Sequence, residues 1–99
     1  MDGDEELLDE LLDMFLQDFP ARLKELKQAL EENDAMLLAQ RAHTIKGTSA
    51  NIGAHALKDV AFEIEKTGNA GDLNLARTLV RKLESKFEKL QLVLSGPGV

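Results

Sequence analysis

Cysteine, tryptophan and tyrosine are absent from this 99-residue sequence, and only two of its residues are proline. Without cysteine the chain can form neither a disulfide framework nor a thiolate metal site. Folding must therefore rest on the burial of apolar side chains, and this length is enough for one domain with a single core. We expect that domain to cover residues 1–95 and residues 96–99 to form a disordered tail.

Basic residues are too few to balance the acidic ones. The sequence has 12 lysines and arginines against 18 aspartates and glutamates, a net charge of -6. Nucleic acids and anionic membranes are bound by basic surfaces, so we expect neither as a partner. No apolar run approaches the roughly 20 residues that cross a bilayer, and the first ten residues are acidic where a secretion signal would be basic. A cytoplasmic location is therefore expected.

Period-two alternation and clusters of β-branched residues are also missing. Apolar residues instead recur at spacings of three and four, which predicts amphipathic helices and an all-α fold. Because proline restricts the residue before it, Phe19 and Pro20 are expected to separate the first two helices. Short connections favour an antiparallel up-down four-helix bundle with an additional N-terminal helix. The five expected helices cover residues 4–17, 20–32, 35–52, 55–67 and 73–94.

Polar and glycine residues mark the expected helix ends. Asp34 is predicted to cap the helix that begins at residue 35, and Asp72 the last helix. Gly53 is expected to adopt a left-handed conformation after the third helix. Gly68, in the stretch GNAGD, is expected to end the fourth helix.

The stretch RAHTIKGTSANIG places a glycine inside a predicted helix, where it costs about 1 kcal/mol relative to alanine. His43 lies at the edge of the predicted buried stripe, so we expect its imidazole to face solvent. Lys46, one turn later, can donate to phosphoryl oxygens and favours the neutral, nucleophilic form of the imidazole. Gly47 leaves the approach to the ring open. The three residues together favour transfer of an anionic group.

The segment AHTIKGTSANIGAHAL resembles the histidine-containing phosphotransfer (HPt) domains of bacterial and fungal phosphorelays. The shared pattern is a histidine, two residues, Lys-Gly, a stretch of small residues, an apolar residue, a glycine, and a leucine four residues beyond. The resemblance implies that His43 accepts a phosphoryl group on Nε2 from a receiver aspartyl phosphate and passes it to another receiver. It also implies that Lys46 stabilises the phosphoryl group and that Gly47 gives access.

The same resemblance implies partners and cofactors. Response-regulator receiver domains, a hybrid histidine kinase, or both would be the partners. The chain itself would be a monomeric phosphoryl carrier and not an enzyme, with no nucleotide, cofactor or metal site, because the Mg²⁺ used in transfer belongs to the receiver.

Further residues are expected around His43. A hairpin turning at Gly53 would bring Glu65 back towards the imidazole, where its carboxylate can accept a hydrogen bond from Nδ1, although members of the family often have an amide in this neighbourhood. Gln40 is a second candidate neighbour. The expected partner surface consists of small residues near the histidine, with leucines of the first helix at its rim: Ala39, Ala50, Leu8 and Leu12.

Two other functions are compatible with the pattern. One is a non-catalytic helical adaptor, which offers no reason for Gly47. The other is the N-terminal histidine domain of a chemotaxis-type kinase, which carries a similar motif. A histidine kinase dimerisation domain fits poorly, because Thr44 follows the histidine where an acidic residue is usual and no proline occurs before Pro97.

The remaining conspicuous side chains have simpler interpretations. His55 is predicted to be a surface or capping residue. It cannot form a metal site with His43 by the usual spacing, since the two are not at i and i+4 of one helix. We interpret Met14 and Met36 as filler in the core or at its edge.

Overall fold

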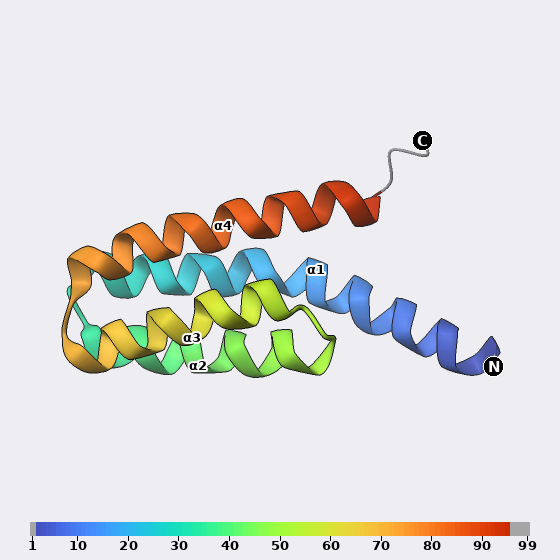
Figure 1. The fold of residues 1–99 in the computed structure, drawn as a ribbon, viewed down its shortest axis with the longest axis horizontal. Helices are drawn as coiled ribbons and strands as arrows, with labels where there is room; N and C mark the ends of the chain where they lie inside the picture. Colours follow the sequence, from blue (N-terminus) through green and yellow to red (C-terminus); the bar gives the residue numbers. More distant parts are fainter. Residues whose placement is uncertain (1, 96–99) are drawn as a thin grey trace.

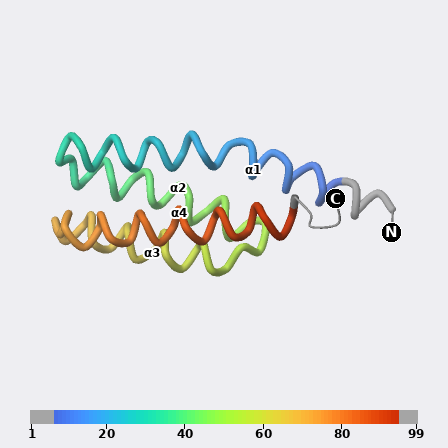
Figure 2. The backbone as a smooth tube through the Cα atoms, turned by 90° about the horizontal axis from the view of Figure 1, so that it is seen from above, coloured from blue at the N-terminus to red at the C-terminus, as the bar shows by residue number. Residues whose placement is uncertain are grey.

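The computed structural model describes the backbone of residues 2–95 and the side chains of residues 7–94. Within this part of the chain the structure consists of four helices: α1 (Asp2–Glu31), α2 (Ala35–Asn51), α3 (His55–Ala70) and α4 (Leu73–Ser95). Successive helices run antiparallel in an up-down bundle, as Figures 1 and 2 show. The predicted all-α bundle is confirmed. The tail expected at residues 96–99 lies outside the described residues.

The core contains buried residues of all four helices and includes three phenylalanines. The rings of Phe19 and Phe87 stack with centroids 4.1 Å apart, and Phe15 packs 5.3 Å from Phe19. The Phe19–Phe87 stack joins α1 to α4. The other fully buried large side chains come from all four helices and follow the predicted stripes: Leu26, Leu38, Ile45, Ile64 and Leu83.

The separate N-terminal helix predicted for residues 4–17 is wrong, because α1 continues through Pro20. Phe15, Phe19 and Leu23 follow one another at four-residue spacing on this helix and are all buried. A break at Phe19 would turn one of the two phenylalanines away from the core. Each such burial contributes about 1.5–3 kcal/mol, which offsets the roughly 3 kcal/mol cost of proline inside a helix. Pro20 itself is exposed, so water can solvate the carbonyl that it leaves without a donor.

The predicted end of the fourth helix at Gly68 is also wrong. The helix α3 continues to Ala70, and Gly71, with φ 77°, is its left-handed cap. Gly68 is helical and buried, and a Cβ there would lie 2.9 Å from the Ala35 carbonyl oxygen and 3.0 Å from the Ala39 Cβ. The glycine therefore allows α3 to pack closely against α2.

The other predicted helix caps are confirmed. The side chain of Asp34 accepts from the Leu37 amide at 3.0 Å, and that of Asp72 from the Leu75 amide at 3.1 Å. Gly53 has φ 75°, the left-handed conformation expected after α2. Gly53 lies in the short turn between α2 and α3, and the two helices lie side by side along their length (Figure 1).

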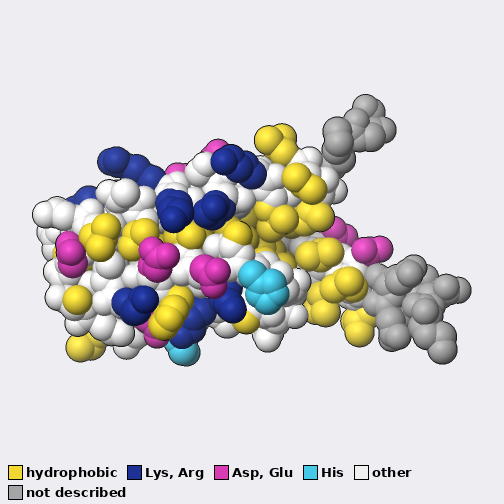
Figure 3. Space-filling view, in the orientation of Figure 1, with side chains coloured by type: hydrophobic (Ala, Val, Ile, Leu, Met, Phe, Trp, Pro, Cys, Tyr) yellow, Lys and Arg dark blue, Asp and Glu magenta, His cyan; other side chains and the backbone are white. Residues whose placement is uncertain are grey.

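One end of the bundle carries much exposed apolar surface. The N-terminal part of α1 projects beyond the other helices there (Figure 1), and hydrophobic side chains gather at the same end in Figure 3. Large exposed hydrophobic residues of this end are Leu7, Leu8, Leu11, Met14, Leu92, Val93 and Leu94. None of the described helices is long and apolar enough to span a membrane.

Candidate functional site

His43 lies near the middle of α2 with 66% of its side chain exposed. The predicted exposure of the imidazole is therefore confirmed. Gly47 lies one turn further along the same helix, and a Cβ added there would meet no atom within 4 Å. The position is open on its outer side, as an access role requires, and no packing contact in the described structure calls for a glycine.

Glu65 on α3 connects His43 and Lys46. Its Oε2 lies 2.9 Å from His43 Nδ1, and its Oε1 accepts a hydrogen bond from Lys46 Nζ at 2.7 Å. The helices α2 and α3 approach closely at Gly68, one turn further along α3, and the glutamate side chain bridges the two helices. The predicted contact between Glu65 and the imidazole is thus present.

The environment of Glu65 favours its ionised form. The hydrogen bond from Lys46 is the main cause that lowers the pKa of this carboxyl group, the hydrogen bond with His43 adds to it, and partial burial opposes both. An ionised carboxylate can only accept, so Nδ1 of His43 must be the donor. In the neutral imidazole the lone pair then lies on Nε2, which makes Nε2 the nucleophilic atom.

Lys46 is more constrained than the sequence suggested. Its side chain is 27% exposed, and besides its ion pair with Glu65 the ammonium group lies 4.9 Å from the centre of the Phe62 ring. Its contacts in this structure are therefore with α3, and its direct effect is on the carboxylate that holds the imidazole.

A hollow of about 340 Å³ lies beside the imidazole. It is lined by residues of α2 and α3, namely Met36, Ala39, Gln40, His43, Glu65 and Asn69. Gln40 is exposed one turn before His43, so its amide shares this space. Met36 is 73% exposed, and the interpretation of this residue as core filler is wrong. Met14, at 64%, is likewise exposed.

The predicted small-residue partner surface needs revision. Ala39 is only 6% exposed, because it packs against Gly68 on α3, so it cannot form an exposed centre of such a surface. Ala50 is exposed towards the end of α2, as expected.

The two predicted leucines of α1 are not beside the histidine. Leu12 lines a hollow with Leu94 of α4. The hollow beside Thr48 of α2 is lined by other α1 residues, among them Leu11 and Met14, and not by Leu8 or Leu12. Leu8 is exposed one turn further towards the N-terminus.

Two side chains of α3 near the site, those of Phe62 and Lys66, were not predicted from the sequence. Phe62 is 45% exposed, and Lys46 and Lys66 both lie over its ring, with Lys66 Nζ 4.5 Å from the centroid. An aromatic residue at i−3 from Glu65 must share its side of the helix, so helical spacing from Glu65 would have found it.

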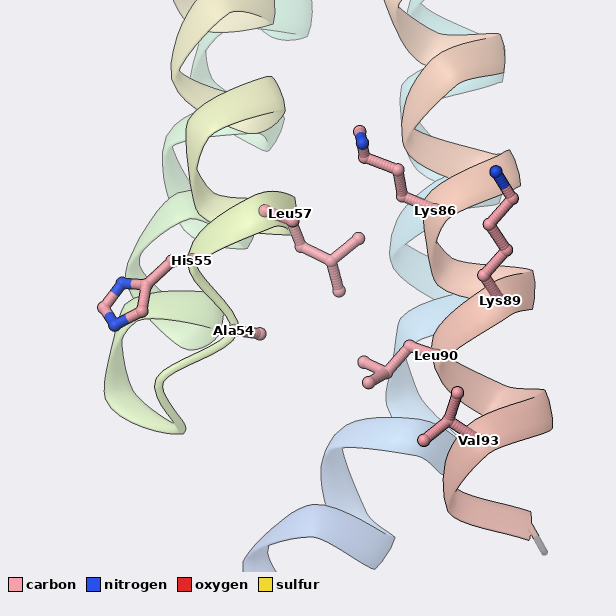
Figure 4. A pocket seen from close by; sticks show the side chains of 8 residues that line it. Ala54, His55, Leu57, Lys86, Lys89, Leu90 and Val93 are labelled. Atoms are coloured by element: carbon pink, nitrogen blue, oxygen red, sulfur yellow. The ribbon is translucent and has the colours of Figure 1, made fainter.

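His55 belongs to another part of the surface. It is exposed in the first turn of α3, as predicted for a surface residue. Nearby, a groove of about 350 Å³ separates α3 from α4. Figure 4 shows Leu57, Leu90 and Val93 pointing into this groove and the His55 ring turned away from it. Among the described residues, no group of three or more potential ligands could hold a metal ion.

Comparisons with known proteins agree on one family. The family model for the Hpt domain matches residues 10–92. The chain is 30% identical over 94 residues to the phosphorelay intermediate protein rdeA of Dictyostelium discoideum, covering 95% of this chain and 37% of rdeA. It is 30% identical over 86 residues to the phosphorelay protein LuxU of Vibrio vulnificus strain YJ016, covering 86% of this chain and 75% of LuxU.

A solved structure has the same fold. The crystal structure of histidine-containing phosphotransfer protein B (HptB) from Pseudomonas aeruginosa PAO1 superposes with a TM-score of 0.85 at 32% identity. The match covers 94% of this chain and 84% of that one. The similarity therefore extends over nearly the whole bundle and includes all four helices.

Proposed function

Because the chain belongs to the Hpt domain family, whose members act in histidine phosphotransfer, we propose that His43 is its phosphoacceptor. The observation that carries the proposal is the hydrogen bond between Nδ1 and Glu65, which directs the free lone pair of the exposed imidazole to Nε2. The open position at Gly47 beside it supports access by a partner domain.

The transfer step follows from this arrangement. The Nε2 lone pair attacks the phosphorus of a receiver aspartyl phosphate, a P–N bond forms, the P–O bond to the aspartate breaks, and the carboxylate leaves with the bonding electrons. The ring becomes positively charged as the bond forms. Glu65, ionised beside Nδ1, stabilises that charge without taking the proton. The reverse step passes the phosphoryl group to an aspartate of another receiver.

Three neighbours support this chemistry in the proposal. Lys46 keeps Glu65 ionised before transfer, and its flexible side chain can then donate to phosphoryl oxygens. Gln40 lines the hollow beside the ring and can donate from its amide. Gly47 leaves space for the partner, because no side chain stands beside the imidazole there.

The proposed partners are response-regulator receiver domains, a hybrid histidine kinase, or both. The chain would act as a cytoplasmic, monomeric carrier, without nucleotide or metal chemistry of its own, while the receiver supplies Mg²⁺. A non-catalytic adaptor would leave the open glycine and the Glu65 network without a purpose.

The proposal is tested by incubating the protein with ³²P-labelled receiver domains. The label should appear on the unaltered protein, be stable in base and labile in acid, and be absent from His43→Gln. His55→Gln is the matched control and should accept label normally. Both substitutions replace exposed side chains, so the free energy of unfolding should change by no more than about 0.5 kcal/mol. Label retained by a folded His43→Gln protein would refute the assignment.

A further inference from the structure

Phe62 is an exposed aromatic residue beside the phosphoacceptor, and its ring faces two cations. The ammonium groups of Lys46 and Lys66 lie 4.9 Å and 4.5 Å from its centroid. A cation at this distance from a ring is attracted to its electron-rich face. Lys46 is connected to His43 through Glu65. Phe62 and Lys66 are not part of that hydrogen-bond network.

Lys66 forms no ion pair within the part of the chain that the structure describes. Its described contact is with the Phe62 ring, and no carboxylate among the described side chains pairs with it, whereas Lys46 is bound to Glu65. The chain as a whole carries a net charge of -6. Figure 3 shows basic side chains lying beside hydrophobic and acidic ones over α2 and α3. A local positive charge on an acidic protein suits an acidic partner.

We propose that Phe62 and Lys66 form a docking element on α3 that binds the acidic surface around the receiver's phosphorylated aspartate. The inference rests on the proposed function. A receiver that binds Mg²⁺ next to its aspartate must line that site with carboxylates, because Mg²⁺ prefers oxygen ligands. Lys66 offers these carboxylates a cation, and Phe62 offers a flat apolar contact of the kind that anchors interfaces.

The position of the element fits an approach to His43. Phe62 precedes Glu65 by three residues, so the two share a side of α3, and Lys66 follows Phe62 by four residues and lies over its ring. On α2, the exposed Met36 borders the hollow at His43. A domain seated over Nε2 could therefore contact large apolar side chains of both α2 and α3.

The experiment compares four variants in transfer from one phosphorylated receiver, the domain that exchanges fastest with the unaltered protein. Phe62→Ala should raise KM for the receiver by about tenfold or more, as loss of an interface anchor does. Phe62→Tyr keeps the aromatic ring, so its KM for the receiver should stay within about threefold of the KM of the unaltered protein. Lys66→Glu should raise KM by about tenfold at low salt, and the difference should shrink as salt is added. Lys24→Glu, an exposed position on α1 with the same change of charge, is the control and should leave KM unchanged.

The rate at saturating receiver separates docking from chemistry. No hydrogen bond or ion pair joins Lys66 to His43 or Glu65 in the described structure, so Lys66→Glu should change that rate by less than about twofold. An unchanged KM in both Phe62→Ala and Lys66→Glu, or an equal rise in Lys24→Glu, would overturn the docking inference. Failure of the unaltered protein to accept label from every receiver would instead overturn the proposed function.

Discussion

Gly47 and Gly68 lie on neighbouring helices, but a side chain would meet open space at the first and backbone at the second. Both positions are helical, so alanine should improve helix propensity at each by about 1 kcal/mol. The space available to the added Cβ then decides whether alanine raises or lowers the free energy of unfolding.

We expect Gly47→Ala to raise the free energy of unfolding by up to about 1 kcal/mol. At Gly68, a Cβ 2.9 Å from the Ala35 carbonyl oxygen forces α2 and α3 apart. Gly68→Ala should therefore lower the free energy of unfolding by roughly 1–3 kcal/mol. Urea titration of the two variants measures both values. Destabilisation of similar size in both would show that Gly47 is present for packing.

Gly47→Gln tests access directly. Nothing near this position is crowded, so the variant should fold normally. The glutamine side chain would lie across the approach to His43, while the imidazole and Lys46 stay in place. The variant should therefore lose most of the rate of transfer from a phosphorylated receiver. The Gly47→Ala protein, with one methyl group, should lose much less. Full transfer by a folded Gly47→Gln protein would show that the receiver approaches from another direction.

Glu65→Gln tests the pH dependence of the network. The pKa of Glu65 is below its ordinary value of 4.5 in the folded protein, so its ionised form stabilises the fold above that pH and the contribution is lost as pH falls through the lowered pKa. The unaltered protein should thus be more stable than Glu65→Gln near neutral pH, and the difference should shrink below about pH 4.5.

Thermal unfolding of both proteins between about pH 3 and pH 7 measures this effect. Glu63→Gln is a useful control, because Glu63 lies on the same helix and forms no ion pair in the described structure. A difference between the unaltered protein and Glu65→Gln that stays constant across the range would contradict the assigned ion pair.

Ser49 offers a prediction about the core. Its hydroxyl group is fully buried and has no hydrogen-bond partner in the described structure. An unsatisfied buried hydroxyl is destabilising, and alanine also has the higher helix propensity. We expect Ser49→Ala to raise the free energy of unfolding by about 1 kcal/mol, measured in urea. A loss of stability would indicate that the hydroxyl group makes a contact with water.

Much of the fold follows from the sequence because the buried stripes have helical spacing. Three- and four-residue recurrence correctly predicted the helices that contain His43 and Glu65, and the turn at Gly53 brought them together. Pro20 was misjudged because local propensity takes no account of the burial of Phe15 and Phe19 on a continuous helix. Gly68 was misjudged because a glycine that caps a helix and one that admits a neighbouring helix look alike in a sequence.

At the site, the sequence predicted the important side chains, but it predicted only some of the contacts between them. The exposed His43 and the contact of Glu65 with Nδ1 were both expected. The pairing of Lys46 with Glu65 depends on side-chain direction across two helices, which no spacing within one helix reveals. Ala39 was placed on the surface because the position of α3 was unknown.

The close contact at Gly68 should also affect the proposed reaction, because Gly68 lies one turn from Glu65 on α3. A bulkier residue at position 68 would push α3 away from α2. The hydrogen bond of 2.9 Å between Glu65 and His43 Nδ1 would then lengthen and weaken. The imidazole would then lose its fixed orientation while the bundle remained folded. We therefore expect a substitution at Gly68 to slow the proposed phosphoryl transfer in a protein that still folds, although residue 68 contacts neither His43 nor the phosphoryl group.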